Sequence, residues 1–470
     1  MVGREKEIDQ LNRMFDSDES EFVAVYGRRR VGKTYLIRET FRDRFVFMHS
    51  GTVEAGITKQ LARFRKSLQE YGYNTPRQLT DWDAAFDALK IIIAKDTRRK
   101  KVLFLDELPW MDTPRSGFIT ALEAFWNGWA SARKDVLLIV CGSAASWMIK
   151  NLLRNRGGLH NRVTCRILLS PFTLGECAKL AAEYGLAMSD DDIAEAYMAF
   201  GGIPYYWRYL DRRFSLVQNF DSIFFGADAP LKDEFKELYH SLFKNASGYI
   251  RIVEALSHKK IGMTRDELCK VLNLKPSGGF SDKLEVLEQS GFIRRYRGFG
   301  NIKKGAVYQL IDEFTLFHFT FLANGTTDIS YWTTNAVGQS RRTWRGLAFE
   351  RLCLQHLEKL RAALGITGVH VEAYAWRHQP DEEFPEGAQI DLLLDRSDGV
   401  INLCEMRYSQ DEYRIDEKIW NELSRRRAIF SAVTQTHKAV HLTLVTPAGL
   451  AHNSYFNRIQ SVITFRDLLR

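Results

Sequence analysis

The sequence has few cysteines, and none is placed for a disulfide framework or a zinc ribbon. The 470-residue chain contains six cysteines, and no two of them form a C-x-x-C pair. Scattered cysteines are typical of proteins that fold in a reducing compartment. A fold that depends on disulfides is therefore excluded, and a chain of this length can bury a substantial apolar core instead.

The sequence also lacks any apolar run of about 18 residues, the length that indicates a membrane-spanning helix. Its first residues, MVGREKEIDQLNRMF, are charged and predict a helix rather than a signal peptide. We therefore expect a cytoplasmic protein that has no membrane partner.

Acidic residues are outnumbered by basic ones. The net charge is +8, and the isoelectric point is about 9.0. This balance favours a polyanionic partner such as DNA, although a soluble enzyme with a basic surface fits it equally well. With 45% hydrophobic and 26% charged residues, the chain has the composition of a folded globular protein.

The first half of the chain predicts an α/β fold, and the length agrees with about three domains. Apolar runs such as FVAVYG, FVFM, VLFLD and VLLIVCG alternate with amphipathic helices up to residue 170. This alternation predicts a parallel sheet covered by helices. Residues 171–238 are expected to be helical, with a Gly-Gly-Ile-Pro interruption at 201–204.

Residues 239–324 predict a winged helix. YIRIVEALSH, MTRDELCKVL and FSDKLEVLEQSG are expected to be helices, FIRRYR and AVYQLID to be strands, and FTLFHFTFL to be a buried linking helix. The third helix is acidic, which suits DNA phosphates poorly. Phosphate contact is therefore expected from the basic strand and wing, although such a module also serves as a spacer between domains. The basic residues are Arg294, Arg295, Arg297, Lys303 and Lys304.

The motif GRRRVGKT at 27–34 follows a strand and precedes a helix, and it fits G-x-x-x-x-G-K-[ST]. Its backbone N–H groups would surround the β-phosphate of ATP, Lys33 would neutralise the β- and γ-phosphates, and Thr34 would bind Mg²⁺. The candidate nucleotide-binding residues are Gly27, Arg28, Arg29, Arg30, Val31, Gly32, Lys33, Thr34 and Tyr35.

Polar residues at the ends of two further strands complete this candidate site. In VLFLDE, Asp106 would hold Mg²⁺ through water, and Glu107 would orient or deprotonate the attacking water. After VLLIVCG, Ser143 is placed to touch the γ-phosphate or that water. Arg162 is a candidate for the γ-phosphate within the chain or on a neighbouring subunit, and an ordinary surface arginine is the alternative.

These motifs, together with VGREKEI, LFLDELPWM, VCGSAASWM and GGIPYYW, resemble those of the archaeal-type ATPases of the AAA+/STAND group. The resemblance covers about residues 1–235. It implies a P-loop ATPase core at 1–170, followed by a helical lid at 171–238 whose Pro204 lines the adenine pocket. It also places Val2, Gly3 and Arg4 beside the base.

Residues 340–470 predict a small αβ domain. They resemble the restriction-endonuclease-like domain at the C-terminus of the same ATPases, in the segments WRGLAFERLCLQH, AQIDLLLDR and INLCEMRYS. A helix is expected at 344–363 and near 416–430, and strands near 367–375, 389–395, 400–406 and 439–446. Glu350, Asp391 and Glu405 are the candidate ligands for Mg²⁺ or Mn²⁺.

Two further residues qualify this nuclease-like site. Gln389 precedes Asp391 on the same face of its strand and is expected to point into the site. Arg407 stands where such nucleases carry lysine; it can bind a phosphate but cannot accept a proton. A working nuclease, a phosphate-binding site without cleavage, and a structural ion-pair cluster all stay open.

The sequence as a whole predicts an ATP-hydrolysing switch that uses ATP and Mg²⁺ and acts on DNA. A non-cleaving DNA-binding regulator and an ATPase that senses a protein partner are the alternatives. Self-association stays open.

Overall fold

The computed structural model describes residues 1–73, 78–153, 157–159, 161–243, 245–300, 306–326, 328–335 and 338–470. The chain divides into two compact units, Met1–Pro171 and Phe172–Arg470. Among the described residues, no helix has both the length and the apolar character needed to cross a membrane.

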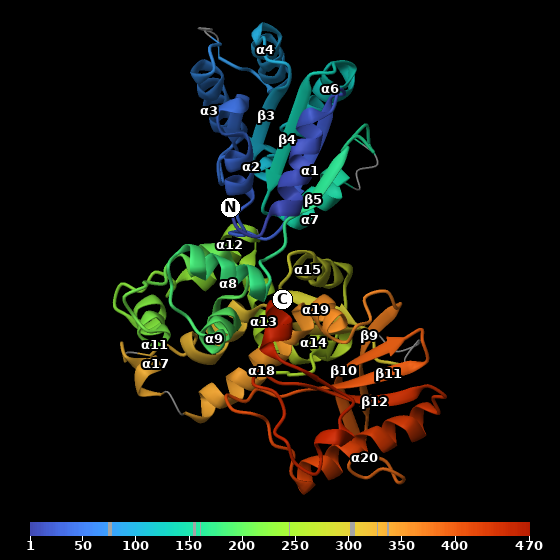
Figure 1. The fold of residues 1–470 in the computed structure, drawn as a ribbon. Helices are drawn as coiled ribbons and strands as arrows, with labels where there is room; N and C mark the ends of the chain where they lie inside the picture. The colour runs from blue at the N-terminus through green and yellow to red at the C-terminus, as the bar shows by residue number, and fades with distance from the viewer. Residues whose placement is uncertain are drawn as a thin grey trace. The chain divides into compact units, whose positions relative to one another are not determined.

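The first unit contains a five-stranded sheet in which every strand pairs in parallel with its neighbours (Figure 1). The strand order is β2-β3-β4-β1-β5. Their bounds are β1 (Glu21–Tyr26), β2 (Phe45–Ser50), β3 (Lys101–Asp106), β4 (Val136–Gly142) and β5 (Cys165–Leu168). Central strands β3 and β4 are buried along their whole length, which explains their continuous apolar runs. The predicted α/β fold class is confirmed.

Helices cover this sheet. Phe64, Phe86 and Phe125, from α3, α4 and α6, pack with strand residues in one large apolar core. The helical elements are α1 (Glu5–Asp16), α2 (Lys33–Phe41), η1 (Arg42–Arg44), α3 (Ile57–Glu70), α4 (Trp82–Lys95), α5 (Leu108–Met111), α6 (Phe118–Gly128), η2 (Ala130–Ala132), α7 (Ala145–Met148) and η3 (Ile149–Leu153).

The second unit begins with short helices, and α8, α9 and α11 start at capping residues. Thr173, Ser189 and Ser215 each form a capping box, which satisfies backbone N–H groups at the start of α8, α9 and α11. The elements are α8 (Leu174–Glu183), α9 (Asp190–Phe200), α10 (Pro204–Trp207), α11 (Leu216–Phe220), η4 (Asp221–Phe225) and α12 (Glu234–Leu242).

Three helices and a small antiparallel sheet follow, with strand order β6-β8-β7. Thr264 and Glu267 form the expected capping box at the start of α14. Lys303 and Lys304 of the expected wing tip lie outside the described residues. The elements are α13 (Ala246–Ser257), β6 (Met263–Thr264), α14 (Arg265–Val271), α15 (Gly278–Gln289), β7 (Ile293–Tyr296) and β8 (Val307–Leu310).

The rest of the second unit carries a five-stranded mixed sheet of order β13-β12-β11-β10-β9, along which α20 lies (Figure 1). The linking segment consists of α16 (Glu313–Phe317), which is buried as expected, and η5 (His318–Leu322), in which only Phe321 is buried. The remaining elements are α17 (Tyr331–Thr334), α18 (Gln339–Gln355), α19 (Leu357–Ala363), β9 (Val371–His378), β10 (Ala388–Arg396), β11 (Val400–Met406), α20 (Glu417–Thr434), β12 (Ala439–Val445), η6 (Phe456–Arg458), β13 (Ser461–Ile463) and α21 (Phe465–Leu469).

The predicted helix at 344–363 is divided in two. His356 separates α18 from α19, and its buried ring accepts a hydrogen bond of 2.8 Å from the backbone N–H of Leu174. The helix is thus interrupted where His356 contacts a residue far away in the sequence. No local pattern in the sequence indicates such a contact.

Candidate functional site

The phosphate loop connects β1 to α2 and has a backbone that requires glycine at two points. Gly27 has φ 142°, and a Cβ there would lie 2.3 Å from the carbonyl oxygen of Leu169. Gly32, immediately before α2, has φ 94°. These left-handed conformations let the loop turn tightly into the helix, whose N-terminus favours an anion.

Lys33 points back into this loop. Its ammonium group donates hydrogen bonds to the carbonyl oxygens of Gly27 (3.0 Å) and Arg28 (2.8 Å), and only 5% of the residue is exposed. Burial lowers the pKa of Lys33, and nearby acidic groups partly oppose that shift. A phosphate entering the loop would give this buried cation an anionic partner in place of neutral carbonyls.

Asp106 at the end of β3 faces Thr34. The Thr34 hydroxyl donates to Asp106 Oδ2 at 2.9 Å, and the backbone N–H of Glu107 donates to Oδ1 at 3.0 Å. Cys141 also donates to Oδ1 through its thiol, at 2.9 Å. The hydroxyl and the carboxylate are therefore adjacent and suited to share a hydrated Mg²⁺ ion.

Glu107 and Ser143 meet at the ends of β3 and β4. The Ser143 hydroxyl donates to Glu107 Oε1 at 2.6 Å, and the Ser143 backbone N–H donates to Oε2 at 3.2 Å. Glu107 has a left-handed backbone, with φ 49°. Both carboxylate oxygens are thus oriented by one residue, in a geometry suited to a general base.

The N-terminal segment also lies against the phosphate loop. The Arg4 guanidinium donates to the carbonyl oxygens of Val31 (3.1 Å) and Ser170 (2.9 Å). Arg162 and Tyr35 are exposed, and Pro204 begins α10 in the second unit. The nucleotide contacts expected for these residues stay predictions.

Sequence reasoning missed Gln60, a fully buried residue of α3. Its amide donates to the carbonyl oxygens of Thr52 and Trp110, both at 2.7 Å, and accepts from the Thr52 N–H at 3.1 Å. It thereby ties the segment after β2 to the segment that follows Glu107. The sequence feature that could have identified Gln60 is its position on the apolar face of an amphipathic helix.

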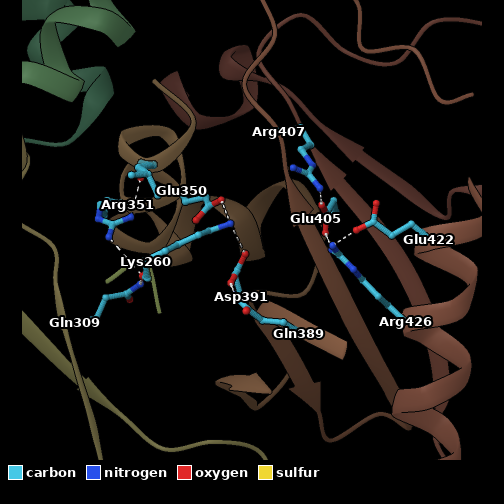
Figure 2. Close-up of polar contacts among 11 residues, drawn as sticks. Lys260, Gln309, Glu350, Arg351, Gln389, Asp391, Glu405, Arg407, Glu422 and Arg426 are labelled. Carbon is cyan, nitrogen blue, oxygen red and sulfur yellow. Dashed lines mark hydrogen bonds and ion pairs between the residues drawn. The ribbon is translucent and has the colours of Figure 1, made fainter. Parts of the chain in front are cut away.

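The acids of the C-terminal part form two separate charge clusters (Figure 2). In the first, the Lys260 ammonium lies 2.7 Å from Glu350 Oε1 and 3.1 Å from Asp391 Oδ2. Gln389 donates to Asp391 Oδ1 at 2.6 Å. Burial, followed by the charge of Asp391, raises the pKa of Glu350 to about 7 against the opposing effect of Lys260.

In the second cluster, two arginines hold Glu405. Arg407 pairs with Glu405 Oε1 at 2.6 Å, and Arg426 pairs with Oε2 at 3.0 Å. The predicted convergence of Glu350, Asp391 and Glu405 is not seen in this arrangement. Among the residues that the structure describes, no three His, Cys, Asp or Glu side chains are grouped to hold a metal ion.

Lys260 was also missed by sequence reasoning. It lies between α13 and β6, and its backbone carbonyl accepts from Gln309 at 2.6 Å and from Arg351 at 3.4 Å. Arg294 donates in turn to Gln309 at 2.7 Å, and burial lowers the pKa of Arg294 to about 10. Arg294, one of the basic residues expected to offer phosphate contacts from the strand and wing, is part of the framework around Lys260.

The chain is similar to known ATPases in sequence and fold. Residues 1–210 match a family described as an ATPase domain predominantly from Archaea. An uncharacterized protein of Methanocaldococcus jannaschii is 25% identical over 442 residues, which cover 90% of this chain and 91% of that protein. An uncharacterized ATP-binding protein of the same organism is 37% identical over 43 residues, which cover 9% of this chain and 73% of that protein.

Among solved structures, the Walker-type ATPase of Pyrococcus abyssi has a TM-score of 0.50 at 16% identity. The similarity covers 68% of this chain and 96% of that one. This likeness concerns the fold. The match of residues 1–210 to the ATPase family confirms the prediction of an ATPase.

Proposed function

We propose that the chain is an ATP-driven switch in which Mg²⁺ and the γ-phosphate lie between the phosphate loop and the ends of β3 and β4. Lys33 binds the β- and γ-phosphates, Thr34 and Asp106 position Mg²⁺, and Glu107 activates the attacking water. Ser143 orients Glu107. The observation that carries the proposal is the pairing of Thr34 with Asp106 at 2.9 Å beside that of Ser143 with Glu107 at 2.6 Å.

Two substitutions separate binding from hydrolysis in this proposal. Lys33→Ala removes the cation that contacts the phosphates, so binding of a fluorescent ATP analogue should be lost. Glu107→Gln removes the base but keeps the side chain's size, so binding should persist while phosphate release stops. Unchanged hydrolysis in either variant would overturn the assignment.

The output of the switch is proposed to pass through a winged helix to a nuclease-like domain that acts on DNA. Residues 171–238 serve as a helical lid with Pro204 on the adenine, 239–324 as the winged helix, and 340–470 as the nuclease-like domain. Arg162 approaches the γ-phosphate within the chain or across a contact between copies. Support comes from the neighbouring acids Glu350, which is buried, and Asp391, which is partly exposed, since their carboxylates suit Mg²⁺ or Mn²⁺ at a phosphodiester.

A DNA-binding regulator that does not cleave is the second candidate. The two arginines that hold Glu405 favour it, because they occupy both oxygens of the third expected ligand. Incubation of the full chain with supercoiled DNA and Mn²⁺ separates the two functions. Nicking that disappears in Asp391→Asn supports cleavage, whereas salt-sensitive DNA binding without nicking supports the regulator.

A further inference from the structure

One lysine lies between two acids of the C-terminal part, the buried Glu350 and the partly buried Asp391. Glu350 comes from α18 and Asp391 from β10, and each directs one carboxylate oxygen at the Lys260 ammonium (Figure 2). The side chain of Glu350 is 9% exposed, that of Asp391 is 28% exposed, and that of Lys260 is 39% exposed. A positive charge therefore already sits between these acids, and solvent reaches it along the lysine.

The position of Lys260 is fixed by its backbone as well as by its charge. Gln309 and Arg351 both donate to its carbonyl oxygen, and Arg294 fixes the amide of Gln309. Arg351 also donates to the carbonyl oxygen of Leu310 at 3.2 Å. These hydrogen bonds join β7, β8 and α18 around the turn that carries Lys260. They therefore hold the Lys260 side chain next to the two acids.

The ammonium group and a divalent cation need the same oxygens. Mg²⁺ and Mn²⁺ bind carboxylate oxygens at about 2.0–2.2 Å. Glu350 Oε1 and Asp391 Oδ2, the two oxygens that converge, are both taken by Lys260. An ammonium group and a metal ion cannot share that space, because of their size and because of their like charge.

Building on the proposed role of this acid pair, we propose that Lys260 is a resident cation that closes the Glu350–Asp391 site. A divalent cation binds there only after the Lys260 side chain has withdrawn. The winged-helix segment, which carries Lys260, thereby controls cation access to the nuclease-like domain.

The test measures Mn²⁺ binding to the nucleotide-free full chain, by the electron paramagnetic resonance signal of free Mn²⁺. Lys260→Met keeps most of the side chain's bulk and removes its charge. The matched control is Lys259→Met, which changes the exposed neighbouring lysine. The assay is run at about pH 8 for every variant. We expect Lys260→Met to bind one Mn²⁺ at least tenfold more tightly than the wild type and the control.

Three further outcomes are informative. Loss of the gained binding in Lys260→Met/Asp391→Asn assigns it to this acid pair and supports the proposal. Equally tight binding by wild type and Lys260→Met, abolished by Asp391→Asn, overturns the role of Lys260 but keeps the acid pair as a cation site. Absence of binding in every folded variant, including Lys260→Ala, overturns both. Circular dichroism establishes that each variant is folded.

Discussion

Removing the Ser143 hydroxyl should slow ATP hydrolysis without weakening ATP binding. The hydroxyl donates to Glu107 Oε1 at 2.6 Å, a short hydrogen bond to a charged acceptor. Such bonds contribute about 1.5–3 kcal/mol. If Ser143→Ala removes that orienting contact from the transition state, kcat should fall about ten- to hundredfold, since about 1.4 kcal/mol corresponds to a tenfold change in rate. The assay is steady-state phosphate release together with the Kd of a fluorescent nucleotide.

Two controls make this result specific. Ser146→Ala makes the same change in α7 and should leave kcat within about twofold of the wild type. In a Glu107→Gln background, Ser143→Ala should have little further effect, because the two residues act as one unit. A loss confined to KM would refute the orienting role. An increase in kcat would also refute it, since it would mean that Ser143 holds Glu107 away from the water.

Two further predictions concern stability. Glu195→Ala should lower the free energy of unfolding by about 3–5 kcal/mol, because Arg341 and Arg345, each paired with Glu195 at 2.5 Å, lose their buried partner. Calorimetry measures this loss. The control is Asp18→Ala at an exposed ion pair, which should lower the free energy of unfolding by less than about 1 kcal/mol. Burial lowers the pKa of His49 from 6.5 to about 4, so the stability it contributes is full above pH 6.5 and is lost as the pH falls towards 4. Wild type should therefore lose about 2 kcal/mol more than His49→Leu between about pH 7 and pH 5 in urea unfolding, and parallel losses would contradict this.

The sequence indicated which residues of the candidate nucleotide site would lie together, because that site is built from local motifs. The phosphate loop is one continuous segment, and Asp106, Glu107 and Ser143 each follow a short apolar run that predicts a buried strand. Parallel strands bring their carboxyl ends to one edge, so the sequence also implied that these residues meet. β5 was missed because it is short and Arg166 interrupts its apolar residues.

The C-terminal site was less predictable because its charges pair across long distances in the chain. Two neighbouring strands with Asp391 and Glu405 indicated that these acids would share a cation. Instead Glu405 pairs with Arg426 of α20, and Asp391 pairs with Lys260, which comes from the segment before β6. Such partners depend on how the helices and strands pack, and single charged residues in helices and turns carry no pattern that identifies them.

The basic strand and wing illustrate how residues that look equivalent in sequence come to differ in the fold. The Arg294 side chain turns inward, and its Nε donates a hydrogen bond of 2.7 Å to Gln309 Oε1. Arg295 remains half-exposed and pairs with Glu288 at 3.4 Å, whereas Arg297 is exposed. Since only a cation at the surface can meet a DNA phosphate, the proposed DNA contact in this stretch depends on Arg297 far more than on Arg294. Arg294→Ala should then disturb the Lys260 turn, and Arg297→Ala should weaken DNA binding.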